Sequence, residues 1–136
     1  MMLDKDIEKA IVDFLIKELL PSTVYLFGSQ ATKHAHKKSD YDIAYLSEKM
    51  LSHYERFMLA QQLASNLNRD VDLIDLDKAS TVFQAQVVGH GKVLYCTDEN
   101  DRLMFEMLTF KKYARLNEER KEILDAIAET GQVFKD

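Results

Sequence analysis

The stretch F-G-S-Q-A-T-K-H-A-H-K-K-S-D-Y-D, residues 27–42, decides how the rest of this chain is organised. It holds a Gly-Ser pair, Gly28-Ser29, then a polar and basic loop of ten residues, and then two aspartates, Asp40 and Asp42. A glycine at this point lets the backbone approach a ligand closely, and amides that open a helix or nest after it face a phosphate. The stretch therefore predicts a place where an anion and carboxylates meet.

Strands are predicted on both sides of this loop. Residues 23–27, T-V-Y-L-F, form a short apolar run rich in residues that favour strands. Residues 40–46, D-Y-D-I-A-Y-L, predict a second strand. Because side chains alternate along a strand, Asp40 and Asp42 should share one face at its beginning, where a buried sheet meets a cleft.

The remaining periodicities predict an α/β (α+β) fold, in which a small mixed β-sheet of about four strands is flanked by helices. Ser52 and Glu55 form the signature of a capping box at the start of one helix. Pro21 ends another helix, because a residue before proline disfavours the helical region. The predicted helices cover residues 3–20, 52–67 and 80–88, and the further strands cover 70–76 and 92–96.

Composition limits the classes of protein to consider. At 136 residues the chain is long enough for one domain with its own core. A net charge of −5 makes polymeric nucleic acid a poor candidate partner. The single cysteine, Cys96, fits a reducing compartment, and no apolar run is long enough to span a membrane, so we expect a cytoplasmic protein.

The C-terminal part of the chain predicts one long helix over residues 98–130. A continuous helix of that length would extend about 50 Å, whereas the domain should have a radius of gyration of about 14 Å. The helix must therefore break, near Asn117, or project from the body. Its first half is apolar almost all round, which favours a second buried face against a partner or a second copy of the chain.

Asp40 and Asp42 allow two interpretations when they are considered alone. They could be solvated side chains on an exposed edge strand, or they could hold a hard divalent cation such as Mg²⁺, which takes one or two carboxylates together with phosphate oxygens. The Gly28-Ser29 pair before them favours the second interpretation.

The combined pattern resembles the nucleotidyltransferases of the polymerase-β superfamily, and among them the minimal nucleotidyltransferases. Their signature is Gly-Ser, ten residues and then Asp-x-Asp, which corresponds here to Gly28-Ser29 and Asp40-Tyr41-Asp42. A third strand carboxylate completes their site, and V-D-L-I-D-L at 71–76 places Asp72 there, with Asp70 and Asp75 as rivals. One departure follows Gly28-Ser29, because G-S-Q-A-T-K replaces the G-S-R-A-R-G of many members, so both arginines are missing.

The resemblance implies a polymerase-β-like core and metal-assisted nucleotidyl transfer. Gly28 and Ser29 would bind the nucleotide, and Asp40, Asp42 and Asp72 would be the catalytic and metal-binding residues. They would hold two Mg²⁺ ions, with ATP as the substrate, and Asp72 would also help to deprotonate the attacking hydroxyl.

Minimal nucleotidyltransferases of this size resemble the antitoxins of two-gene toxin–antitoxin pairs, whose partner is a HEPN ribonuclease. The resemblance implies that AMP passes from ATP to a tyrosine of this toxin and silences it. Residues 1–97 would form the nucleotidyltransferase core, and 98–136 a helical extension that contacts the partner or a second copy in a homodimer. Two alternatives are an antitoxin that neutralises the toxin by binding alone and a small-molecule nucleotidyltransferase of the aminoglycoside-modifying kind.

Overall fold

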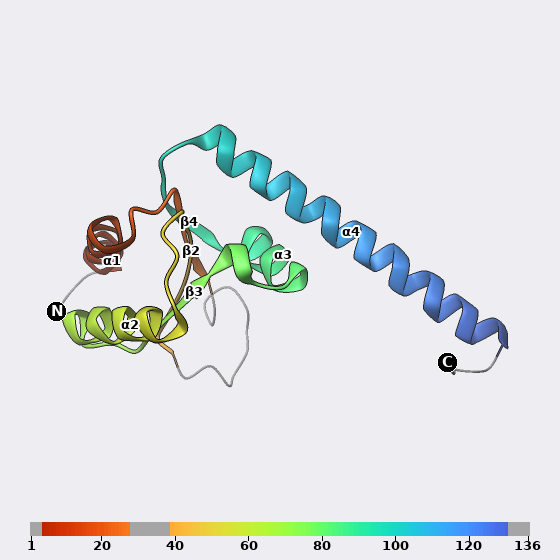
Figure 1. Cartoon of the computed structure of the whole chain (residues 1–136), viewed down its shortest axis with the longest axis horizontal. Coiled ribbons are helices and arrows are strands. Elements are labelled where there is room, and N and C mark those ends of the chain that lie inside the picture. Colours follow the sequence, from red (N-terminus) through yellow and green to blue (C-terminus); the bar gives the residue numbers. More distant parts are fainter. Residues whose placement is uncertain (1–3, 28–38, 131–136) are drawn as a thin grey trace.

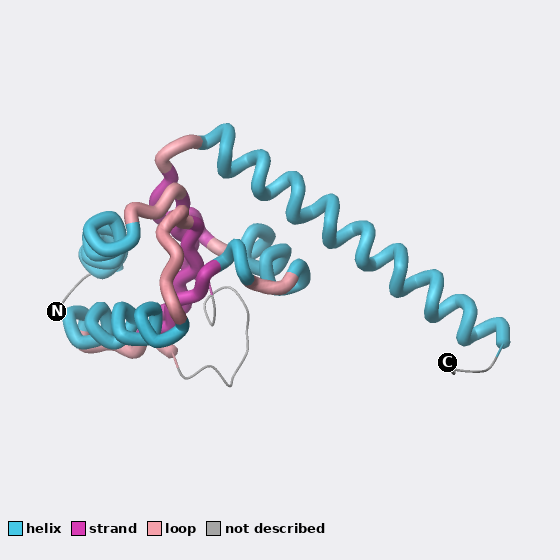
Figure 2. Tube along the Cα trace, in the orientation of Figure 1, coloured by secondary structure: helices cyan, strands magenta, loops and turns pink. Residues whose placement is uncertain are grey.

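The computed structural model describes residues 4–27 and 39–130 of the chain. Figures 1 and 2 show a body of helices packed on a sheet, with one long helix that extends away from it. The elements in chain order are α1 (Asp4–Leu19), β1 (Thr23–Phe27), β2 (Tyr41–Leu46), α2 (His53–Leu67), β3 (Val71–Asp75), the 3-10 helix η1 (Leu76–Lys78), α3 (Thr81–His90), β4 (Lys92–Cys96) and α4 (Glu99–Thr130).

The sheet has the order β3-β2-β1-β4 and is mixed, as the sequence predicts. β1 runs antiparallel to both β2 and β4, whereas β2 and β3 are parallel. Parallel neighbours need a crossover connection, and α2 supplies it here. Among the described residues, β3 and β4 are therefore the two edges of the sheet.

Helices cover both faces of the sheet. α1 and α2 pack on one face, where the core includes Ile11 and Leu63 against Ile43 and Leu73 of the strands. On the other face, α3 and the beginning of α4 contribute Val87 and Phe105, which belong to the cluster around Tyr25 and Ala44. Because side chains alternate along β2, Asp42 lies on the same face as Ala44, the face toward α3.

Several element boundaries follow from local interactions. The capping box of α2 is confirmed, since the Ser52 hydroxyl accepts from the Glu55 amide and the Glu55 carboxylate accepts from the Ser52 amide. η1, which the sequence interpretation missed, begins where the Asp75 carboxylate accepts from the Asp77 amide. α3 continues two residues beyond its expected end, to His90, and Gly91 follows it.

Gly91 is required by a close approach of backbone. A Cβ at this position would lie 2.5 Å from the carbonyl oxygen of Val87 and 3.3 Å from that of Leu26. The Gly91 amide donates to the same Val87 carbonyl, at 2.7 Å. The turn between α3 and β4 thus depends on a residue without a side chain.

α4 is continuous through Asn117, so of the two expected arrangements the structure has the projecting helix. Its 32 residues make it about 48 Å long. A partly buried hydrogen bond joins it to the sheet: the Tyr25 hydroxyl donates to Glu106 at 2.9 Å, and Arg102 donates to the same carboxylate at 2.8 Å. Within the described chain, none of the helices is long and apolar enough to cross a membrane.

Candidate active site

Two of the predicted carboxylates lie side by side at one end of the sheet. In the strand register, Phe27 of β1 is paired with Asp42 of β2, and Asp42 is paired with Asp72 of β3. Paired residues on neighbouring strands point to the same face, and the strands are about 4.8 Å apart. The end of β1, which leads into Gly28, therefore lies in one row with Asp42 and Asp72.

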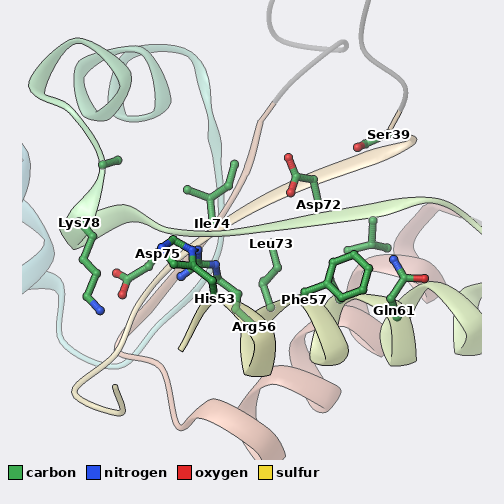
Figure 3. A pocket seen from close by; sticks show the side chains of 13 residues that line it. Ser39, His53, Arg56, Phe57, Gln61, Asp72, Leu73, Ile74, Asp75 and Lys78 are labelled. Atoms are coloured by element: carbon green, nitrogen blue, oxygen red, sulfur yellow. The ribbon is translucent and has the colours of Figure 1, made fainter. Parts of the chain in front are cut away.

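The two carboxylates differ in their exposure to solvent. Asp42 is buried, with 4% of its surface accessible, while Asp72 is exposed. In Figure 3, Asp72 and Ile74 point to one side of β3 and Leu73 points to the other, toward α2. Asp72 thus sits at the rim of the sheet end and Asp42 behind it, on the face toward α3.

Asp40 is held differently from the arrangement expected from the sequence. β2 begins at Tyr41, so Asp40 lies in the bend before the strand. Its Oδ2 accepts from the Asp70 amide at 3.1 Å, and the amides of Asp40 and Tyr41 both donate to the Asp70 carbonyl at 3.0 Å. These bonds fasten the beginning of β2 to the beginning of β3, and they fix the register that brings Asp42 beside Asp72.

The residues fit a magnesium site built from two strand carboxylates. In the described parts of the chain, no group of three or more His, Cys, Asp or Glu side chains is arranged to hold a metal ion. Asp42 and Asp72, however, offer hard oxygen ligands on one face, and Mg²⁺ in nucleotide sites takes one or two carboxylates and completes its shell with phosphate oxygens and water. Gly28 and Ser29, the predicted nucleotide-binding residues, lie outside the described residues.

A hollow of about 600 Å³ runs along the outer edge of β3, next to Asp72. It wraps around the strand, because its walls include Asp72 and Ile74 from one face and Val71 and Leu73 from the other. The remaining walls come from α2, from the segment around η1, and from the residue before Asp40: His53, Arg56, Phe57, Ala60, Gln61, Asp75, Lys78, Ala79 and Ser39.

The polar residues of this hollow, which include His53 and Arg56, were not singled out from the sequence. A usable signal was present, because positions 53, 56, 57, 60 and 61 follow the spacing of one helix face. In the structure, His53 Nδ1 accepts a 2.7 Å hydrogen bond from Arg56, which as a guanidinium can only donate. Burial raises the pKa of Tyr45 and nearby Asp75 raises it further, while the Arg56 charge opposes both effects.

Residues 9–100 match the family model described as polymerase beta, nucleotidyltransferase, and the chain belongs to that family. This confirms the resemblance that the Gly-Ser and Asp-x-Asp spacing indicates. The class defined by the fold and by the paired carboxylates is thus a nucleotidyltransferase.

The relatives specify the class further. A relative named protein adenylyltransferase MntA, from Shewanella oneidensis, is 44% identical over 115 residues, which are 83% of this chain and 82% of the relative. A probable protein adenylyltransferase MntA from Haemophilus influenzae is 38% identical over 82 residues, or 59% of this chain and 72% of that protein.

Solved structures of toxin–antitoxin complexes share the fold. One was determined with AMP-PNP, and its matching chain is 42% identical with a TM-score of 0.74, over 89% of this chain and 98% of that one. Another contains a tri-AMPylated Shewanella oneidensis HEPN toxin in complex with the MNT antitoxin, and its match is 39% identical with a TM-score of 0.75, over 93% and 99% of the two chains. The expected fold class, a polymerase-β-like core with a long C-terminal helix, is confirmed.

Proposed function

We propose that this chain is an antitoxin that transfers AMP from ATP to a tyrosine hydroxyl of a HEPN toxin and thereby neutralises it. The observation that carries the proposal is the register of the sheet, which sets Asp42 beside Asp72 at the end where β1 leads into Gly28-Ser29. Relatives that share most of the chain's length are named protein adenylyltransferases, which supports AMP as the transferred group.

In this reaction the phenolic oxygen of the acceptor tyrosine attacks the α-phosphorus of ATP. The bond between that phosphorus and the oxygen leading to the β-phosphate breaks, pyrophosphate leaves, and the phenolic proton is lost. We assign the acceptance of this proton to Asp72, because its carboxylate is exposed at the rim where an acceptor can approach. Gly28 and Ser29 are proposed to bind the phosphates of the nucleotide.

Asp40, Asp42 and Asp72 are the residues proposed to hold two Mg²⁺ ions. When bound there, the ions would stabilise the charge that develops on the phosphate oxygens. Asp42 suits this role because a buried carboxylate keeps a fixed position and interacts strongly with a nearby charge. Asp40 would have to exchange its hydrogen bond with the Asp70 amide for a metal contact or combine the two.

α4 is the proposed docking surface for the toxin. One side of its first half packs on the body through residues such as Phe105 and Thr109, while the other side leaves large apolar side chains in solvent. Solved relatives are antitoxins in complex with their toxins, which supports a protein partner for this surface. The exposed apolar side chains of α4 are Leu103, Met104, Met107, Leu108, Phe110, Ile123 and Leu124.

This apolar surface also favours one alternative function, neutralisation of the toxin by binding alone. Such a masking antitoxin would need α4 but would not need the paired carboxylates. The two functions therefore differ in what the substitution Asp42→Asn does.

The test is to incubate the chain with Mg²⁺ and α-labelled ATP, with and without the HEPN partner, and to follow both the label and the toxin's ribonuclease activity. We expect label on the partner, loss of labelling and of neutralisation in Asp42→Asn, and retention of both in Asp13→Asn, an exposed aspartate on α1. Neutralisation that persists in Asp42→Asn without any label would establish masking instead.

A further inference from the structure

The hollow along β3 lies beside Asp72, on the side of β3 away from β2 and β1. The order of the sheet places β1, which leads into Gly28-Ser29, next to β2, and β2 next to β3. Asp72 is therefore bordered by Asp42 on one side and by the open edge of the sheet on the other. A nucleotide held over the ends of β1 and β2 leaves this edge available to a second substrate.

The edge of β3 offers backbone groups to an incoming chain. The amide and carbonyl of Asp70 both face β2, because they bond to the Asp40 carboxylate and to the amides of Asp40 and Tyr41. Backbone groups alternate in direction along a strand, so those of Val71 and Leu73 face outward. An extended peptide can pair with such an edge as an additional strand.

The charges in the hollow favour a particular kind of peptide. Arg56 and Lys78 line it, and neither forms an ion pair with a carboxylate of the described residues. The Asp75 carboxylate also lines the hollow; it is buried and accepts from the Asp77 amide, and among the described residues no ion pair joins it to Arg56 or Lys78. Both cations are thus available to an acidic side chain of a bound segment.

We propose that this hollow binds the acceptor segment of the toxin as an extended strand along β3, an inference that rests on the proposed function. A tyrosine paired with Asp72 lies on the same face as that carboxylate, at its side. Residues at an odd spacing from the tyrosine then point to the α2 face, where Leu73 and Arg56 lie. The segment recognised is therefore one that carries Asp or Glu at an odd spacing from its tyrosine.

The test measures KM for the HEPN protein and for ATP separately, using label transfer by the full-length chain. Arg56→Gln and Lys78→Gln should each raise KM for the HEPN protein by about tenfold and leave KM for ATP unchanged. Lys17→Gln, which removes an exposed cation on α1, is the matched control and should change neither constant. A rise in KM for ATP, or no change in either constant, would overturn the proposal.

A second measurement remains decisive if Arg56→Gln unfolds the protein. A photo-crosslinking amino acid at Gln61, an exposed residue of the hollow, should form its adduct on the tyrosine-bearing segment of the HEPN protein. An adduct only elsewhere on that protein, or none, rejects the acceptor site even while label transfer proceeds. If the wild-type chain transfers no label at all, the proposed function fails, and the crosslink alone decides whether the hollow binds the partner.

Discussion

The end of the sheet that carries Asp42 and Asp72 contrasts with the long helix α4. At the sheet end, strand pairing and burial fix the side chains: Asp42 is 4% exposed and is in register with both neighbouring strands. In α4, by contrast, Thr109 is the only buried residue among 32, and seven large apolar side chains face solvent. The chain's own core thus positions the proposed catalytic carboxylates, while the proposed docking surface on α4 remains exposed to solvent.

The substitution with the largest expected effect should slow nucleotidyl transfer without weakening binding of the HEPN protein. We expect Asp72→Asn to lower the rate of label transfer by about 10³-fold, because it would remove the proposed metal ligand and proton acceptor and, with it, roughly 4 kcal/mol of transition-state stabilisation. Binding of the HEPN protein, measured by calorimetry, should stay unchanged. Asp70→Asn is the control: its carboxylate is two residues earlier, and it contacts Asp40 through its backbone, so its rate should remain within a few-fold.

Substitutions on α4 should act mainly on binding of the HEPN protein. Replacing Met107 and Leu108, which are 66% and 53% exposed, by serine should weaken binding of the HEPN protein by about 30-fold, or ~2 kcal/mol. The melting temperature of the free chain should hardly change, because neither side chain is buried. Leu20→Ser removes an apolar side chain outside α4 that is still more exposed, 76% accessible, and should leave binding intact. Equal losses in the two variants would show that α4 is not the docking surface.

A third comparison tests how firmly the core holds the sheet end. Gly91→Ala should lower the free energy of unfolding by about 1–3 kcal/mol, because its methyl group would meet the carbonyls of Val87 and Leu26. Gly89→Ala should instead raise it by up to ~1 kcal/mol, since that helical glycine has open space around its Cβ position. Chemical denaturation of both variants gives the two values, and the same sign for both would contradict this packing.

The smallest effect concerns pH and the start of α2, which borders the hollow. The Ser52 amide, which donates to Glu55, lowers the pKa of that carboxyl below its usual value. A carboxyl whose pKa is lower in the folded state stabilises the fold above its unfolded pKa, and this contribution disappears as the pH falls through the folded pKa. The difference in melting temperature between wild type and Glu55→Gln should therefore be larger at neutral pH than in strong acid. A difference in melting temperature that does not change with pH would mean that the negative charge of Glu55 does not contribute to the cap of α2.

Most of the architecture was predictable because local signals agreed with the fold. Apolar runs marked β1 and β4 at the boundaries the structure has, and Ser52 with Glu55 marked the beginning of α2. The family could be predicted as well, because Gly28-Ser29 and Asp40-x-Asp42 have a specific spacing. The roles of these residues and of Asp72 remain predictions, which the substitutions above test.

The features that escaped prediction depend on contacts between distant segments. Asp40 was expected in the strand, but its bonds to Asp70, thirty residues away, hold it in a bend. The hollow is formed jointly by α2, β3 and η1, and no single stretch of sequence encodes it. Helical periodicity predicted α4 but left open whether the helix breaks near Asn117; in the structure it is unbroken, and Phe105 and Thr109 pack on the body.

The projecting half of α4 has a consequence for local unfolding of the free chain. Between Leu116 and the end of α4 at Thr130, only Ala126 and Ile127 are even partly shielded from solvent. An isolated helix of this length is marginal in water, so the turns after residue 117 should fray and their amide hydrogens should exchange quickly. The turns held by Tyr25 and Glu106 should exchange much more slowly. Bound toxin would erase this gradient, so hydrogen exchange along a single helix would report whether the antitoxin is free or engaged.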